Sequence, residues 1–372
     1  MFTEIQTYIL YNILLLLCPT LCFLSERKNT RWGIFLAYAI LMAVSIFRFD
    51  IGDDYVRYAS MFNEVGKKTI DTITPLDMLM YEPLTFLLSW TFSWAIYPYV
   101  YVMGCYAFAT LFCYYKIFDH YKIHSFGVFF LVATWMLFQA WDGVRQNLAI
   151  AIFVYGIRFI ESRDFLRYLI CLLFAMTAHY SAILMLPFYF VSYIKLDQRI
   201  LTGIVFVVFV LAEIGFLSNM HNSLAALIPY YGQIYADSKY LQNGSGTYHT
   251  TTYILTMLLY MLILFLSKKG HSIFANLLAI GAIIYAEAGG NLTFIRISWY
   301  FTPALMILVP KILQEASSVM EYNKTYVRYL YMIVLFVSLF EGVYLKANFR
   351  NVVPYDSVFL ENFHYQRFRF RE

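Results

Sequence analysis

The sequence has 372 residues, of which 61% are hydrophobic and only 13% are charged, and its formal net charge at pH 7 is +4. A soluble domain of this length does not need so much apolar surface, so the composition excludes a soluble protein. The small positive charge gives no reason to expect nucleic acid as a partner. Uncharged apolar runs of roughly 17–25 residues, enough to cross a bilayer as helices, recur from end to end. Because these runs are continuous rather than alternating, they predict an all-α, polytopic integral membrane protein.

The sequence predicts about twelve transmembrane helices. In chain order they cover residues 7–24, 32–47, 98–116, 126–141, 147–161, 166–179, 181–194, 200–217, 251–267, 272–288, 292–310 and 327–346. No Pro/Gly/Ser-rich linker interrupts them, so we expect residues 1–372 to form a single integral membrane domain. The five cysteines lie in apolar segments without a metal-binding spacing, which predicts free thiols.

Lysine and arginine in the short loops set the orientation, because cytoplasmic loops are enriched in these residues. The basic loops lie near residues 27, 116–122, 158–167, 195–199, 268 and 311–328. All of them lie on the cytoplasmic side only if the short apolar segment 83–97 does not cross the membrane. We therefore predict that segment 83–97 is a re-entrant or interfacial helix. Both termini, the long loops 48–82 and 218–250 and the tail 347–372 then lie outside.

Two arginines lie beside predicted spans on the outer side. Arg145, followed by Gln146, opens one span, and Arg296 lies one turn inside another. Arginine close to hydrocarbon is costly, so it either marks a functional site or extends to the lipid headgroups. A guanidinium group presents a planar fork of donors that matches phosphate. We therefore predict that Arg145, Gln146 and Arg296 bind an anionic part of a substrate.

The first outer loop begins with an acidic and aromatic segment, FRFDIGDDYVRY, at residues 47–58. If this segment were helical, its aspartates at 50, 53 and 54 would share one face with Arg57, paired among themselves or around Mg²⁺ or Ca²⁺. No complete metal-binding loop motif is present, so we expect neither a metal nor another cofactor. We instead predict a polar platform that binds a sugar substrate. Its candidate substrate-binding residues are Arg48, Tyr55, Arg57 and Tyr58, and the two arginines either bind substrate or belong to the architecture of the platform.

Three outer residues are candidates for a general base. Glu82 precedes Pro83 at the start of the short segment, where it either caps a helix or acts as a base whose pKa is raised by burial. His179 lies at a span end, where it is either a hydrogen-bonded structural residue or a base. Asp54 is the third candidate. Glu82 is the first choice, and His179 and Asp54 follow.

Taken in chain order, these residues resemble a known family. The matching motifs are Arg48, Gly52-Asp53-Asp54-Tyr55, Tyr58, Glu82-Pro83, Arg145-Gln146-Asn147-Leu148-Ala149, His179-Tyr180-Ser181-Ala182, Arg296-Ile297 and Val353-Pro354-Tyr355-Asp356-Ser357. The ordered set resembles the EpsG-like branch of the Wzy polysaccharide polymerases, and the resemblance covers most of the chain, from Arg48 to the tail.

The resemblance implies an inverting, metal-independent glycosyltransferase with a GT-C-like architecture. Such a polymerase transfers a growing glycan from undecaprenyl pyrophosphate to a new lipid-linked oligosaccharide repeat unit. The reaction takes place at the outer, periplasmic face of the bacterial inner (cytoplasmic) membrane. The expected partners are the undecaprenyl-pyrophosphate-linked oligosaccharide, the lipid bilayer, a chain-length regulator and a flippase. The resemblance does not decide between an O-antigen and an exopolysaccharide as the product.

Other functions stay open at this point. An O-antigen ligase would use a similar donor but transfer the glycan to lipopolysaccharide, and an acyltransferase would use His179 as its base. A transporter or flippase of lipid-linked oligosaccharide belongs to a different class, and would have broken helices and polar sites near the membrane centre, often in repeated halves. The sequence has no internal repeat and its unusual polar residues gather at one face, which favours an enzyme.

Overall fold

The computed structural model describes residues 1–214, 250–267, 272–288, 292–319, 332–346, 348 and 351–364. Within these residues every regular element is a helix, and the only β pairing is an isolated antiparallel bridge between Arg48 and Ser357. The all-α prediction is therefore confirmed for this part of the chain. Apart from residue 250, the predicted outer loop 218–250 lies outside the described residues, and so does the tail after residue 364.

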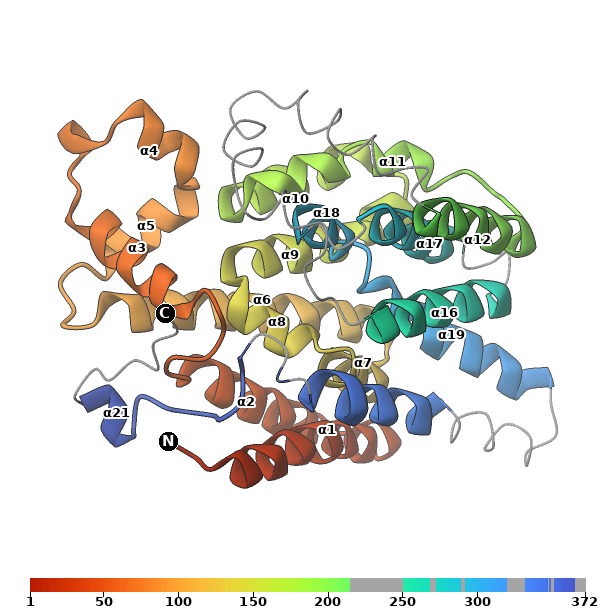
Figure 1. The fold of residues 1–372 in the computed structure, drawn as a ribbon, viewed down its shortest axis with the longest axis horizontal. Helices are drawn as coiled ribbons and strands as arrows, with labels where there is room; N and C mark the ends of the chain where they lie inside the picture. The colour runs from red at the N-terminus through yellow and green to blue at the C-terminus, as the bar shows by residue number, and fades with distance from the viewer. Residues whose placement is uncertain are drawn as a thin grey trace. The chain divides into compact units, whose positions relative to one another are not determined.

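The chain divides into two compact units, Met1–Leu186 with Val327–Glu372 (unit 1) and Pro187–Tyr326 (unit 2), and each is described by itself. The prediction of a single membrane domain stays a prediction. Figure 1 shows the helices of both units. Those of unit 1 are α1 (Glu4–Arg27), α2 (Trp32–Ile46), α3 (Tyr55–Lys67), η1 (Ile70–Thr72), α4 (Pro75–Met80), α5 (Pro83–Thr91), α6 (Pro98–Tyr121), α7 (His124–Ala133), α8 (Met136–Asp142), α9 (Val144–Glu161), α10 (Phe165–Ala178), η2 (Tyr180–Met185), the apolar helix Met332–Leu345, which ends in the π-helix η4 (Phe340–Leu345), and α21 (Glu361–His364).

The core of unit 1 is a set of apolar helices. Helix α1 packs against α2 and α7, α6 packs against α2 and α9, and α9 packs against α10. Helices α1 and α6 have 24 residues each, a length of about 36 Å, so each is long enough and apolar enough to cross a membrane. The other apolar helices in the described part are shorter or bent. The number of twelve spans therefore stays a prediction.

The predicted span 126–141 is not one straight helix. The sequence predicts a span over residues 126–141, but α7 and α8 meet there at an angle of 57°. Trp135 lies between them in a left-handed conformation, with φ of 67°. Its side chain is fully buried. A left-handed backbone conformation costs energy at a tryptophan. We infer that the packing around the buried side chain of Trp135 stabilises the bend between α7 and α8.

Segment 83–97 contains only one short helix. It forms the nine-residue helix α5, followed by turns that lead to α6. Nine helical residues extend about 14 Å, which is too short to cross about 30 Å of hydrocarbon. The segment therefore fits the prediction of a re-entrant or interfacial helix.

Unit 2 is organised around α17. Its helices are α11 (Phe188–Val191), α12 (Gln198–Glu213), α16 (Thr250–Leu266), α17 (Ser272–Glu287), α18 (Leu292–Ser298) and α19 (Ala304–Val319), and α17 packs against α12, α16, α18 and α19. A Cβ atom on Gly281 would lie only 2.5 Å from the Cβ atom of Phe301, so glycine permits this close approach. Asn276 of α17 donates hydrogen bonds to the carbonyls of Ser192 (3.2 Å) and Ile194 (2.8 Å), which ties α17 to the turn after α11.

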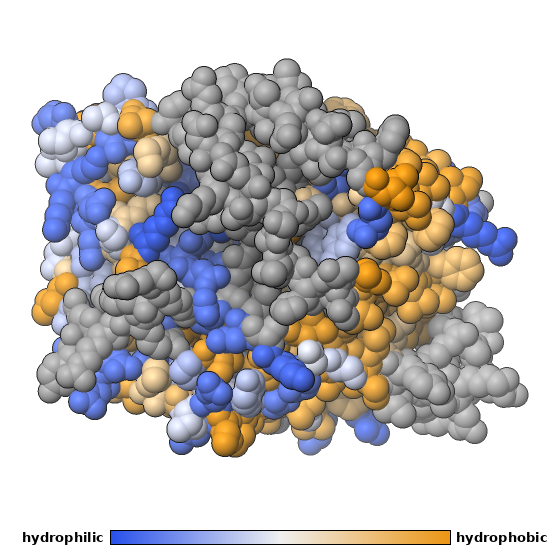
Figure 2. Space-filling model, viewed as in Figure 1, coloured by the Kyte–Doolittle hydropathy of each residue, from blue (hydrophilic) through white to orange (hydrophobic). Residues whose placement is uncertain are grey.

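The hydropathy of the surface differs between elements. In Figure 2 the visible side chains over α3 and α4 are mostly hydrophilic, whereas those over α12 and α16 are largely hydrophobic. Helix α12 exposes several large apolar side chains, namely Ile200, Ile204, Phe206, Val207 and Val210. Exposed apolar side chains on successive turns are typical of a helix that faces lipid. The polar surface of α3 agrees with the prediction that loop 48–82 lies outside the membrane.

The C-terminal segment 351–358, which we call the C-terminal strap, holds the start of the first outer loop. The backbone N–H of Phe49 donates to the carbonyl of Asp356, and the N–H of Val358 donates to the carbonyl of Phe47, both at 3.0 Å. The hydroxyl of Tyr11 in α1 donates to the carbonyl of Val352 at 2.6 Å. The strap therefore joins α1 to the segment that follows α2.

Candidate active site

Three of the predicted site residues meet in unit 1, although they lie far apart in the sequence. Oε1 of Glu82 lies 2.5 Å from Nδ1 of His179, and Oε2 of Glu82 accepts a hydrogen bond from Nη1 of Arg145. These contacts form an ion pair with Arg145, and a second one whenever His179 is protonated. We call the three residues the Glu82 cluster.

The backbone around Glu82 directs its side chain away from α5. Glu82 occupies the N-cap position in an extended conformation, as the proline that follows it requires. Its side chain makes no capping hydrogen bond to α5. The carboxylate is therefore free to contact Arg145 and His179, and the capping role considered from the sequence is not what this geometry shows.

The other two members are placed by helix ends. Arg145 is the second residue of α9, directly after the break between α8 and α9 at Gly143. His179 is the C-cap residue of α10, with extended φ of −158° and ψ of 122°. The neighbouring Tyr180 donates from its hydroxyl to the carbonyls of Met78 (2.9 Å) and Tyr81 (3.3 Å). This contact fastens the segment that carries His179 to the residues just before Glu82.

Burial within the cluster is graded. The side chain of Glu82 is 3% exposed, that of Arg145 is 17% exposed, and that of His179 is 29% exposed. A buried carboxylate is costly unless it is paired. Burial raises the pKa of Glu82, but the charge of Arg145 and the hydrogen bond from His179 together outweigh it, so the pKa lies below its ordinary value of 4.5. The prediction that burial would bring this pKa towards neutrality is wrong, because both carboxylate oxygens have hydrogen-bond partners.

Arg145 has a donor left for another group. Its Nε atom is buried and has no hydrogen-bond partner among the described residues. Its Cζ atom lies 5.4 Å from the ring centroid of Tyr58, which is within the range of a cation–π interaction. A buried guanidinium group with an unpaired N–H can donate a hydrogen bond to an anionic oxygen without breaking its pairing with Glu82.

Two further residues line the cluster that the sequence analysis did not select. The hydroxyl groups of Tyr106 and Thr85 lie 3.2 Å apart, and the charges of Glu82 and Arg145 both act on Tyr106. Phe62 of α3 stacks between Tyr58 and Tyr106, with centroid distances of 5.7 and 6.0 Å. Tyr106 lies in an apolar helix, where its sequence gives no sign of a role. The position of Thr85, one turn after Glu82, is the only sequence signal for that residue.

Arg48 is part of the architecture of this region. It is 2% exposed, and its guanidinium group donates to the carbonyl of Ser45 and, at 3.2 Å, to the carbonyl of Trp141. Burial lowers its pKa to about 10, so the group stays charged at neutral pH. Of the two roles considered for Arg48, substrate binding and architecture, these contacts favour architecture.

The acidic segment of the first outer loop is not helical. Helix α3 begins at Tyr55, and Asp50 and Gly52 have φ angles of 48° and 102°. The shared acidic face considered from the sequence is therefore not formed. The backbone N–H of Asp54 instead donates to Oδ1 of Asp142 at 3.0 Å. This bond joins the loop to the end of α8, just before Arg145.

The remaining candidates are dispersed. Tyr55 is 1% exposed, and its hydroxyl donates to the carbonyl of Arg48 at 3.5 Å. Arg57 is exposed on α3, and Gln146 is buried in the first turn of α9. Arg296 is half-buried in α18 of unit 2, so its position relative to the Glu82 cluster is not defined.

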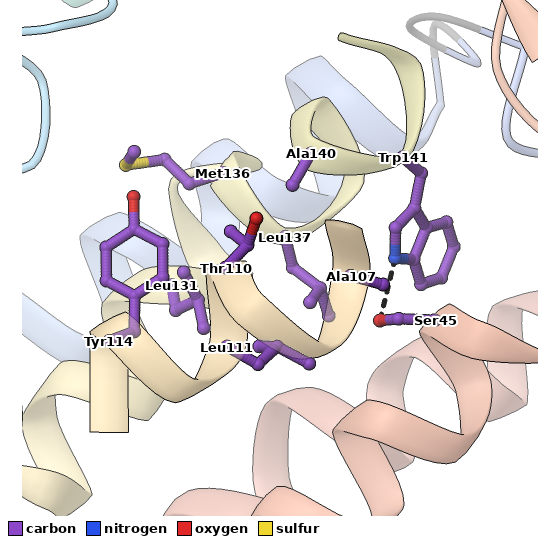
Figure 3. Close-up of a pocket in the computed structure, with 10 residues that line it drawn as sticks. All are labelled: Ser45, Ala107, Thr110, Leu111, Tyr114, Leu131, Met136, Leu137, Ala140 and Trp141. Atoms are coloured by element: carbon purple, nitrogen blue, oxygen red, sulfur yellow. Dashed lines mark hydrogen bonds between the residues drawn. The ribbon is translucent and has the colours of Figure 1, made fainter. Parts of the chain in front are cut away.

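A small pocket in unit 1 lies between α2, α6, α7 and α8 (Figure 3). Its lining is mostly apolar, and Trp141 donates from Nε1 to the hydroxyl of Ser45 at 2.9 Å at one side of it. It contains no member of the Glu82 cluster, so we place no substrate there. In the part of the chain that the structure describes, no group of three or more His, Cys, Asp or Glu side chains is arranged to hold a metal ion.

The chain matches the model of the EpsG family over residues 31–357. It belongs to the EpsG family. The matched range contains the whole Glu82 cluster, Arg48, Arg296 and most of the C-terminal strap. Comparisons with curated proteins and with solved structures found no match. The EpsG family indicates a polysaccharide polymerase-type membrane protein with glycosyltransferase-like activity, and the apolar helices agree with a membrane-embedded chain.

Proposed function

We propose that this EpsG-family protein is a polysaccharide polymerase that uses undecaprenyl-pyrophosphate-linked oligosaccharides. It transfers the growing glycan from its lipid pyrophosphate to a new lipid-linked repeat unit, at the outer face of the bacterial inner membrane. The observation that carries the proposal is the Glu82 cluster, in which a buried carboxylate, an arginine and a histidine meet in a member of this family.

Arg145 binds the pyrophosphate of the donor in this proposal. As the glycosidic bond breaks, negative charge grows on the leaving phosphate oxygen, and a preorganised cation in a dry site stabilises that charge most in the transition state. The unpaired Nε–H of Arg145 supplies a donor for this oxygen. Arg296 is the proposed second cation for the pyrophosphate, and Gln146 adds a neutral contact.

The acceptor hydroxyl needs a group that removes its proton while it attacks the anomeric carbon. Glu82 and His179, two of the three candidates for this base, are in direct contact. A direct displacement inverts the anomeric carbon and uses no metal. The aromatic residue Tyr58 and the exposed Arg57 of α3 are the proposed contacts for the sugar units.

The same proposal includes the lipid bilayer and two partner proteins. The polyprenyl tail of the substrate stays in the bilayer while its pyrophosphate reaches Arg145. A flippase delivers the repeat units to the outer face, and a chain-length regulator acts together with the polymerase.

Purified protein in proteoliposomes tests the function directly. The proposal expects incubation with an undecaprenyl-pyrophosphate-linked repeat unit to give a ladder of polymer on a gel. Arg167→Ala is a matched control, because Arg167 is 69% exposed and lies in the first turn of α10, at the opposite end of that helix from His179. A ligase would give a single transfer to added lipopolysaccharide and no ladder. A flippase would move labelled substrate across the bilayer without forming new glycosidic bonds. Either result would contradict the proposed polymerase.

A further inference from the structure

We propose that His179 is the catalytic base of the Glu82 cluster and that Glu82 is a positioning residue which orients the imidazole ring. This inference rests on the proposed function. It reverses the order expected from the sequence, in which Glu82 was the first candidate, and three features of the structure carry it.

The first feature is that both oxygens of Glu82 are occupied. One contacts His179 at 2.5 Å, and the other accepts from Arg145. The side chain is only 3% exposed. An acceptor sugar would have to displace one of these two partners before Glu82 could take its proton.

The second feature is the tautomer that Glu82 imposes on His179. An ionised carboxylate can only accept hydrogen bonds, so the Nδ1 atom of His179 must carry the proton that lies between the two groups. Neutral imidazole carries one N–H only, so its Nε2 atom then has a free lone pair. Within the described residues Nε2 has no hydrogen-bond partner, because the one recorded bond of the ring is made by Nδ1.

The third feature is accessibility. The side chain of His179 is 29% exposed, compared with 3% for Glu82. His179 also follows α10 in an extended conformation, so it lies at the outer end of a helix rather than inside one. The imidazole ring is therefore more accessible to a polar substrate than the carboxylate of Glu82 is.

The proposed step balances as follows. The acceptor hydroxyl oxygen forms a bond to the anomeric carbon of the donor while its proton moves to Nε2 of His179. The bond between the anomeric carbon and the phosphate oxygen breaks, and its electron pair leaves with the lipid pyrophosphate beside Arg145. Glu82 stabilises the imidazolium ion that results, and the proton later passes to water.

Polymerisation kinetics of His179→Gln and Glu82→Gln, measured over a range of pH, test the assignment. His179→Gln should lose roughly 10²–10⁴-fold in kcat at every pH and keep its affinity for the donor. Glu82→Gln should retain a slower reaction and keep its affinity for the donor. Added imidazole should partly restore His179→Ala, but not Glu82→Gln.

Two results would overturn the proposal. One is a His179→Gln variant with wild-type rate and pH dependence, and the other is a folded, donor-binding Glu82→Gln variant without activity at any pH. A second measurement does not depend on polymerisation. Diethyl pyrocarbonate should modify His179 rapidly in the wild-type protein. A His179 that resists the reagent contradicts the base assignment, whereas a wild-type protein that makes no polymer contradicts the function.

Discussion

Arg48 donates a hydrogen bond of 3.2 Å from Nη2 to the carbonyl oxygen of Trp141. This contact joins residues 93 positions apart, and Trp141 lies four residues before Arg145. Together with the bond from Asp54 to Asp142, it fixes the start of the first outer loop to the junction of α8 and α9. The position of Arg145 therefore depends on a buried arginine that need not contact substrate itself.

Arg48→Ala should destabilise the protein. It removes the donor of two buried carbonyl groups, and we expect a loss of about 2–5 kcal/mol in the free energy of unfolding. Arg48→Lys should restore only part of the lost stability, because an ammonium group does not reproduce the planar fork of guanidinium N–H donors. Thermal unfolding in detergent measures the effect. An Arg48→Ala variant with unchanged stability but no polymer would show direct substrate binding instead.

Gly52→Ala should also destabilise the loop junction. Gly52 has φ of 102°, which L-residues rarely adopt, and a Cβ atom there would lie 3.1 Å from the Cα atom of Asp142. Gly203→Ala in α12 is a matched control, because nothing lies within 4 Å of the added atom. Unfolding midpoints of the two variants should differ clearly, with Gly52→Ala lower. Equal midpoints would show that the loop adjusts freely.

The stability of the protein should fall on acidification through the Glu82 cluster. The pKa of Glu82 is lower in the folded protein than its ordinary value of 4.5, so the unfolded chain takes up this proton first. The contribution of the ion pair is complete above about pH 4.5 and is lost as the pH falls through the lower folded pKa. Unfolding midpoints of wild type and Glu82→Gln should therefore converge below pH 4.5. If the difference between the two midpoints grew below pH 4.5, the pKa of Glu82 would be raised in the folded protein rather than lowered.

The predicted topology places Gly143 outside and Lys268 inside. Single cysteines introduced at these positions, in a background without the five native cysteines, can be labelled in intact cells with a reagent that does not cross membranes. The cysteine at residue 143 should react, and the cysteine at residue 268 should react only after the cells are opened. The opposite pattern would require segment 83–97 to cross the membrane.

The sequence singled out the three residues of the Glu82 cluster, because charged and titratable groups are unusual beside apolar helices. Glu82, Arg145 and His179 stand out as charged or titratable groups at the ends of apolar segments, and the structure brings them together. The sign of the pKa shift of Glu82 could not be predicted, since it depends on which partners reach the carboxylate. A single sequence does not reveal that residues 63 and 97 positions further along the chain contact this carboxylate.

Other structural features could not be predicted from the sequence. The break between α7 and α8 lies at Trp135, whereas breaks are usually predicted from glycine or proline. Tyr106 and Trp141 look like ordinary core residues, although one lines the cluster and the other accepts a hydrogen bond from Arg48. The acidic segment before α3 has the spacing of a helix face, but its positive φ angles make it a loop.

The arginine pair gives the most direct test of the account. We expect Arg145→Ala and Arg296→Ala to abolish the polymer ladder formed from an undecaprenyl-pyrophosphate-linked repeat unit, in membrane-inserted protein whose thermal unfolding shows that it is folded. Lysine should restore little activity at either position, because a point charge replaces a fork of donors. The control Arg167→Ala should give the wild-type ladder. A full-length ladder from Arg145→Ala would contradict the central claim that the Glu82 cluster binds the pyrophosphate of the donor.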